Sequence, residues 1–296
     1  MGKEPVKVNE LKASERINAF EEVVLGYCEE EALTEAKRCL QCKNPTCISG
    51  CPVGIDIKKF IHQVSRKDYS GAYFTIREKN NFPSLCGRIC PAEYQCRKAC
   101  VLTKKGSAFA SENSIYINFL ERFVGDYGMN KHLSVSPDTD KKLSSFKVAV
   151  VGSGPAGLCC AGELARKGIK VTVFEGLHNS GGVLRYGIPP FRLPRDVLDF
   201  EINYLEKLGV TIMPNFIIGK TKALSELFKE GYAAVFLGLG AGIPSFLGIN
   251  GENLCNIYSA NEFLTRVNLM SAFRVPDYHT PVNIGMHIIV IVGGNT

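Results

Sequence analysis

Two patterns of apolar and polar positions divide the chain. Up to about residue 130, apolar residues recur every three or four positions in four stretches, with Gly or Pro between them, which predicts short helices. From Lys147 onward, short apolar runs such as KVAVVG and KVTVFE alternate with helical stretches, which predicts a parallel α/β sheet. The helical stretches of the first part are 14–24, 29–40, 56–80 and 114–128.

A polar, serine-rich stretch lies between the two patterns. Residues 129–146 show no periodicity, which is typical of a linker. The final residues, HIIVIVGGNT, predict one more strand and a glycine turn without a following helix, so we interpret the chain as truncated there. The predicted parts are a helical domain at 1–130, a linker at 131–146, the first part of an α/β domain at 147–285 and a truncated domain at 286–296.

Composition excludes several classes of protein. The chain has 296 residues, 45% of them hydrophobic, and a net charge of +6, but its Lys and Arg residues form no basic block, so we expect no nucleic acid as partner. The polar N-terminus lacks a signal-peptide pattern, so we expect the cytoplasm. The uncharged run 232–249 contains four glycines and a proline, which favours a buried strand and a turn over a membrane span.

The cysteines are concentrated in one region. Eight of the twelve lie between Cys39 and Cys100, and because a reducing cytosol opposes disulfides, this clustering favours metal or iron-sulfur ligation. The first group has the spacing C-x2-C-x4-C-x3-C-P and the second C-x3-C-P-x4-C-x3-C. The members are Cys39, Cys42, Cys47 and Cys51 in the first group, and Cys86, Cys90, Cys96 and Cys100 in the second.

Pro52 directly follows Cys51, as in the ferredoxin run where the cysteine before proline serves a different cluster from its neighbours. This precedent predicts two interleaved iron-sulfur clusters, with Cys51 joining the second group. The alternative is zinc in four-thiolate sites, although two zinc sites more often show paired C-x2-C knuckles. The spacing leaves open whether Cys86 is a ligand.

A glycine-rich turn begins the second part of the chain. Gly152, Gly154 and Gly157 lie between a predicted strand and a predicted helix, and Glu175 ends the next strand, which is the fingerprint of a dinucleotide site. FAD and NAD share this fingerprint. The continuation NSGGVLRYGIPPFRLPRD favours FAD, because two further glycines allow a second close backbone approach and Arg192 can reach a phosphate or the flavin ring.

Several runs resemble one known family. RCLQCKNPTC with CPVGIDI, CGRICPAEYQC, VGSGPAGL, GGVLRYGIPPFRLP and YSANEFLTRVNLM are similar, from about Arg16 onward, to the small (β) subunit of NADPH-dependent glutamate synthase. Its relatives include the large subunit of the electron-bifurcating NADH-dependent ferredoxin:NADP oxidoreductase and the N-terminal part of dihydropyrimidine dehydrogenase. The resemblance implies an α+β multidomain fold: an N-terminal α-helical [4Fe-4S] domain, then a Rossmann-like FAD-binding domain interrupted by an NADPH domain.

The resemblance also implies site residues. One [4Fe-4S] cluster would be bound by Cys39, Cys42, Cys47 and Cys100, and the other by Cys51, Cys90, Cys96 and Glu121. The alternative for Glu121 is a solvated charge on its helix, and Cys86 would not be a ligand. The residues implied for FAD are Gly152, Ser153, Gly154, Pro155, Ala156, Glu175, Gly181, Gly182, Val183, Arg192 and Ile218.

The function implied by the resemblance is that of an oxidoreductase. Electrons from NADPH would pass through FAD and two [4Fe-4S] clusters to a partner subunit, and the flavin would supply the chemistry, so no side chain is expected to be catalytic. The partner would be a glutamate synthase large subunit or a small subunit with flavin and [2Fe-2S]. A non-catalytic electron relay is the alternative, because Val292 replaces the first glycine of the second fingerprint and most of an NADPH domain is missing.

Overall fold

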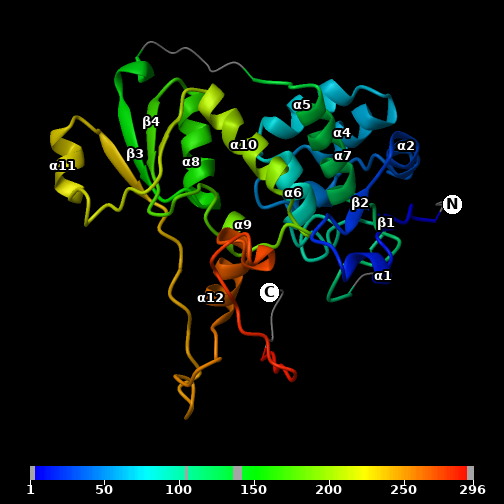
Figure 1. Ribbon diagram of the computed structural model, residues 1–296. Helices are drawn as coiled ribbons and strands as arrows, with labels where there is room; N and C mark the ends of the chain where they lie inside the picture. Colours follow the sequence, from blue (N-terminus) through cyan, green and yellow to red (C-terminus); the bar gives the residue numbers. More distant parts are fainter. Residues whose placement is uncertain (1–3, 104–105, 136–141, 292–296) are drawn as a thin grey trace.

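The computed structural model describes residues 4–103, 106–135 and 142–291. Figure 1 shows two parts side by side, a group of helices from the N-terminal half and a twisted sheet with helices from the C-terminal half. The fold is therefore the predicted one, an α-helical domain followed by a Rossmann-like α/β domain.

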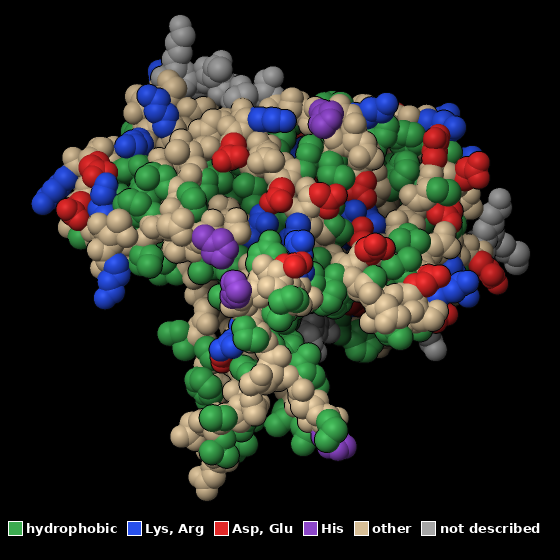
Figure 2. Space-filling model, in the orientation of Figure 1, with side chains coloured by type: hydrophobic (Ala, Val, Ile, Leu, Met, Phe, Trp, Pro, Cys, Tyr) green, Lys and Arg blue, Asp and Glu red, His purple; other side chains and the backbone are tan. Residues whose placement is uncertain are grey.

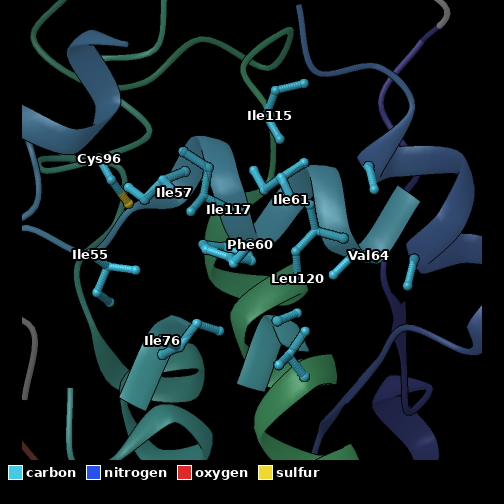
Figure 3. Packing of buried hydrophobic residues seen from close by; sticks show 14 of the residues in the cluster. Ile55, Ile57, Phe60, Ile61, Val64, Ile76, Cys96, Ile115, Ile117 and Leu120 are labelled. Carbon is cyan, nitrogen blue, oxygen red and sulfur yellow. The ribbon is translucent and has the colours of Figure 1, made fainter. Parts of the chain in front are cut away.

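The described residues of the helical domain contain five helices of seven residues or more. Asp56 and Asp68 each accept a hydrogen bond from a backbone N–H three residues on and so cap two of these helices. The core between the helices contains Phe60, Ile61 and Leu120, all at most 1% exposed (Figure 3). The elements are α1 (Ala13–Arg16), α2 (Glu29–Ala36), α3 (Thr46–Ser49), α4 (Ile57–Ser65), α5 (Tyr69–Arg77), α6 (Pro83–Ile89) and α7 (Ile117–Asn130), with β1 (Asn9–Glu10) antiparallel to β2 (Val24–Gly26).

Three of the four predicted helical stretches are confirmed. The stretch 56–80 contains two helices rather than one, because the chain turns at Lys67, where φ is +63°, and Asp68 starts a new helix. The prediction of a helix over 14–24 is wrong beyond Arg16. There the backbone forms other bonds: Leu11 N–H donates to Val23 O, and Val23 N–H donates to Phe191 O.

The Rossmann-like domain contains a four-stranded parallel sheet in the order β5-β4-β3-β6. Val148 pairs with Val171 on one side and with Ala234 on the other, so β3 lies in the middle. This confirms the predicted alternation of strands and helices. The elements are β3 (Lys147–Val151), α8 (Pro155–Arg166), β4 (Lys170–Phe174), α9 (Val183–Tyr186), α10 (Arg195–Lys207), β5 (Thr211–Met213), α11 (Leu224–Lys229) and β6 (Ala234–Leu237). Short helices complete the list: the 3-10 helices η1 (Leu143–Ser145) and η3 (Ala272–Arg274), the π-helix η2 (Thr265–Leu269) and α12 (Ala260–Leu264).

The chain beyond β6 extends away from the sheet. Figure 2 shows many apolar side chains on this lower extension. Ile243 and Ile289, which belong to this part of the chain, are each 88% exposed. The strand predicted within 286–296 is not formed over 286–291, because no neighbouring strand pairs with these residues. Residues 292–296, and residues 136–141 of the predicted linker, lie outside the described residues. Among the helices of the described ranges, none has the length and apolar character that crossing a membrane requires.

The two domains share a buried contact. Phe82, which directly precedes α6, and Leu85 of α6 belong to the same apolar cluster as residues of α8 and α10. Beside this cluster, the guanidinium of Arg77 forms an ion pair with Glu201 of α10 at 2.6 Å, and both side chains are at most 2% exposed. The helix that Cys90 caps therefore shares one apolar cluster with α10 and with α8, the helix that begins at the glycine turn.

Candidate functional site: two groups of cysteines and a glycine turn

The predicted ligands divide by cluster and not by sequence run: the first group is Cys39, Cys42, Cys47 and Cys100, and the second group is Cys51, Cys90, Cys96 and Glu121. The first group surrounds one cavity. Cys39 and Cys42 come from the loop that follows α2, Cys47 lies on α3, and Cys100 ends the second cysteine region. Ile57, Ile61, Ile115 and Ile117 provide apolar walls. The four predicted members of the first ligand set, Cys39, Cys42, Cys47 and Cys100, therefore lie together.

The surroundings disfavour the ionised form of two of these thiols. Burial, together with the neighbouring Cys100 and Cys39, raises the pKa of Cys47 to about 12. Burial also raises the pKa of Cys39. A positive charge in the cavity would favour the thiolate forms of Cys39 and Cys47, so this donor set fits a cationic metal centre.

The second group is assembled from separate elements. Cys90 is the residue at which α6 ends, Glu121 lies one turn inside α7, and Cys51 and Cys96 lie in loops. Electrostatic contacts connect Cys96 with Glu121, Cys51 and Cys90. The close packing of α6 on α7 brings them together: a Cβ on Gly87 would lie 2.4 Å from the backbone nitrogen of Arg122.

Glu121 is a buried carboxylate. Only 7% of the residue is exposed, so it is not a solvated charge on its helix. Burial and the neighbouring Cys90 raise its pKa to about 8, whereas a hydrogen bond from the Asn80 amide, at 2.7 Å, lowers it. A carboxylate in such surroundings fits a nearby cation.

Cys86 also faces the second group. Its sulfur lies 3.5 Å from Asn80 Oδ1 and within hydrogen-bonding reach of the Cys90 sulfur. This contact raises the pKa of Cys86 and lowers that of Cys90. Over the described ranges, no three side chains of His, Cys, Asp or Glu come together as a site for a single metal ion.

The glycine turn lies where the central strand β3 meets α8. Gly152 has φ +98°, and a Cβ there would lie 2.3 Å from the carbonyl oxygen of Gly238, so only glycine fits. Gly154 is the N-cap of α8, with no side-chain cap and with open space where a Cβ would stand. The first N–H groups of α8 can therefore bind an anion such as a pyrophosphate.

Glu175 is connected to this turn. Its Oε2 accepts a hydrogen bond from Ser153 N–H at 2.9 Å and another from the Ser153 hydroxyl. Its Oε1 accepts one from Leu177 N–H at 2.8 Å, which leaves one lone pair of that oxygen for a further donor. The residue is 6% exposed, so this acid is fixed beside the glycine turn, as a ribose-binding acid must be.

A second glycine pair covers the turn. Gly181 N–H donates to the Ser153 hydroxyl at 3.0 Å. Gly182 has φ +51°, and a Cβ there would lie 2.6 Å from Gly154 Cα. The predicted residues that the structure brings together at this place are Gly152, Ser153, Gly154, Pro155, Ala156, Glu175, Gly181, Gly182 and Val183.

Two predicted residues lie apart from the turn. Arg192 is exposed and lines a hollow with Arg16, Phe20 and Phe191, where the N-terminal segment meets the second domain. Ile218 packs against Ala149 and the other residues of the sheet face that α8 does not cover. Sequence reasoning did not find Asn80, although an Asn pair before a proline is a signal for a turn with side-chain hydrogen bonds.

Comparison with known proteins gives two matching family models. Residues 16–133 match the model described as dihydropyrimidine dehydrogenase domain II, 4Fe-4S cluster. Residues 150–211 match an NAD(P)-binding Rossmann-like domain. The two models cover the two domains of the structure, so the chain carries a 4Fe-4S domain followed by a dinucleotide-binding domain.

Individual relatives extend over both domains. The chain is 32% identical over 287 residues to the glutamate synthase [NADPH] small chain of Azospirillum brasilense, with 96% of this chain and 58% of the relative covered. It is 40% identical to the NAD-dependent dihydropyrimidine dehydrogenase subunit PreT of Escherichia coli O157:H7, with 77% and 54% covered. The chain thus spans little more than half the length of these relatives.

Proposed function

As a homologue of the glutamate synthase small chains and of the dihydropyrimidine dehydrogenase subunits PreT, this protein is, we propose, an oxidoreductase subunit that transfers electrons from NADPH through FAD and two [4Fe-4S] clusters to a partner protein. The observation that carries the proposal is the separation of eight donors into two groups. One group surrounds a cavity and the other joins α6 to α7.

The donor sets support iron-sulfur clusters. Cys39, Cys42, Cys47 and Cys100 would hold the first cluster, and Cys51, Cys90, Cys96 and Glu121 the second. Thiolates are the usual ligands of iron-sulfur clusters, and the buried Glu121 supplies a fourth anionic donor. The zinc alternative is less well supported, because two zinc sites more often show paired C-x2-C knuckles than the spacing found in this chain.

The glycine turn supports FAD. The N-terminus of α8 would bind the pyrophosphate, Glu175 would accept a hydrogen bond from a ribose hydroxyl, and Gly182 would allow the backbone to approach the dinucleotide. Arg192 would act at the far end of the cofactor, in the hollow beside Phe191. When bound, FAD accepts a hydride and gives up electrons singly, and [4Fe-4S] clusters carry single electrons.

The residues of this chain bind, orient and exclude water. Isoleucines around the first group keep water from the thiolates, and hydration and hydrogen bonding are two of the factors that set the potential of a cluster. The contact of α6 with α8 and α10 holds the second group at a fixed position relative to the glycine turn. No side chain is required as acid, base or nucleophile.

The candidate functions differ in the partner that accepts the electrons. The match with glutamate synthase small chains favours a large glutamate synthase subunit as electron acceptor. The 40% identity with PreT, which is named as a dihydropyrimidine dehydrogenase subunit, favours a pyrimidine-reducing partner instead. A small subunit with flavin and [2Fe-2S], as in electron bifurcation, is a further candidate. Cytoplasmic location stays the prediction made from the sequence.

The test is anaerobic purification of the full-length protein, followed by measurement of iron, sulfide, zinc and flavin. We expect eight iron atoms and one FAD per chain, since two [4Fe-4S] clusters hold four iron atoms each. NADPH should then reduce a viologen dye, and the same protein without NADPH is the control. A colourless protein that contains zinc and no flavin would contradict the proposal, and a coloured protein that leaves the dye unreduced would indicate a relay without dehydrogenase activity.

A further inference from the structure

Asn80 lies at the centre of a small buried network next to the second group of cysteines. It follows α5, and 7% of it is exposed. Its Nδ2 donates to Glu121 Oε1 at 2.7 Å, and its Oδ1 accepts from Phe82 N–H at 2.9 Å. The same oxygen is 3.5 Å from the sulfur of Cys86. One amide thus connects a backbone turn, a carboxylate and a thiol.

The backbone decides which way this amide points. Phe82 is the residue before α6 and Pro83 is the first residue of the helix, so the Phe82 N–H has no partner within the helix and needs an acceptor. Asn80 Oδ1 supplies it, in the i to i+2 pattern of an Asx turn. Because the oxygen is used there, the Nδ2 group faces Glu121, and it can only donate.

Cys86 lies on α6 and Cys90 is its C-cap, four residues on, with its backbone N–H bonded to the carbonyl oxygen of Cys86 at 3.0 Å, so the two side chains lie one turn apart. The Cys86 thiol is within hydrogen-bonding reach of the Cys90 sulfur as well as of Asn80 Oδ1. A thiol has one proton to donate. When Cys90 is a thiolate, it is the stronger acceptor of the two, because hydrogen bonds to charged acceptors are stronger than those to neutral ones.

We propose that Asn80 and Cys86 are positioning residues of the second cluster. Asn80 holds the Glu121 carboxylate toward the three cysteines, and the Cys86 thiol donates a hydrogen bond to the ligand sulfur of Cys90. The inference rests on the proposed function, because it needs the second cluster to be present. Hydrogen-bonded partners of metal ligands fix ligand orientation and, through bonds to sulfur, contribute to the potential of a cluster.

The test uses the full-length protein, reconstituted anaerobically and titrated electrochemically while the EPR signal of each cluster is recorded. In Cys86→Ala the midpoint potential of the second cluster should fall, because a donor that stabilises the reduced, more negative state is lost. Cys86→Ser keeps a donor and should restore most of the shift. In Asn80→Asp the carboxylate cannot donate to Glu121, so the second cluster should be lost to a chelator about tenfold faster or more.

The controls separate this inference from the proposed function. Asn18→Asp and Cys255→Ala change exposed residues and should leave both signals unchanged. The first cluster is an internal control in every variant. If both clusters are present and neither Asn80→Asp nor Cys86→Ala alters the second one, the inference is overturned while the proposed function stands. If the unmodified protein contains no second cluster, both the inference and the proposed function are contradicted. Cys86→Ala decides the question if Asn80→Asp does not fold.

Discussion

The two groups of cysteines are built in different ways. Three members of the first group lie within the nine consecutive residues 39–47. Cys100 lines the same mostly apolar cavity as these three. In the second group, Cys51 and Cys96 lie in two different loops, Cys90 lies at the end of α6, and Glu121 lies in α7. The first site depends on local sequence, whereas the second depends on the packing of α6 against α7 and, through α6, on the second domain.

The largest effect that tests this comparison is expected from Cys51→Ala. Cys51 follows the first group directly in sequence but lies with the second group in space. We expect this variant to lose the iron and the EPR signal of the second cluster and to keep those of the first. Loss of the first cluster with retention of the second would show that the division of the cysteines is incorrect.

A change at the contact between domains should affect the second group more than the first. Glu201→Ala leaves Arg77 buried without its partner, which should lower the free energy of unfolding by about 3–5 kcal/mol, measured by urea denaturation. During mild urea treatment, iron of the second cluster should be released first.

The matched control for this variant is Glu262→Ala. It breaks the ion pair with Arg266, in which both side chains are more than a third exposed, so the cost should be about 0–1 kcal/mol. Equal losses from the two variants would contradict the view that the contact between domains supports the second group.

Gly182→Ala should weaken the dinucleotide site alone. A Cβ there would meet Gly154, and the backbone conformation is one that alanine adopts at a cost of about 1–3 kcal/mol. We expect at least about a tenfold loss of FAD affinity, by the relation of 1.4 kcal/mol to a factor of ten, with the iron content unchanged. Gly209→Ala is the control: it also has positive φ, but a Cβ there meets no atom within 4 Å. Equal loss of FAD in both would point to general destabilisation.

The smallest effect is expected in the wall of the first cavity. Ile61→Val removes one methylene group from a residue that is 1% exposed and should cost about 0.5–1.5 kcal/mol. Water should then reach the first cluster more easily, so a chelator should remove it faster while the second cluster is unaffected. Ile76→Val, in the same core but away from the cavity, should cost as much stability without this selectivity.

The contrast between the two groups also explains what the sequence could predict. The glycine turn and most helices could be predicted from short stretches of sequence, because glycine spacing and apolar periodicity depend on the conformation of the same short stretch of backbone. The helix expected over 14–24 failed because Val23 N–H bonds to Phe191 O, a partner that no local pattern indicates. Asn80 and the pair of Arg77 with Glu201 were missed for the same reason: their roles come from side chains that are distant in sequence.

The site residues illustrate this limit further. The proline after Cys51 predicts that this cysteine serves a different cluster from its sequence neighbours, and its electrostatic contact with Cys96 fits that prediction. Burial of Glu121 could not be derived from its helix, because the apolar face of α7 is defined only by what packs on it. Arg192 has the chemistry of a phosphate ligand. In the structure it lines the hollow beside the N-terminal segment, apart from the glycine turn.

The packing of α6 onto α8 and α10 limits how this protein can be divided. The two family models match stretches that end and begin at 133 and 150, which suggests two interchangeable modules. A chain cut between them would expose Phe82 and Leu85 on one piece and leave the carboxylate of Glu201 without its arginine on the other. A gene fusion or domain swap that exchanges one half alone would therefore need a new half with a matching contact surface.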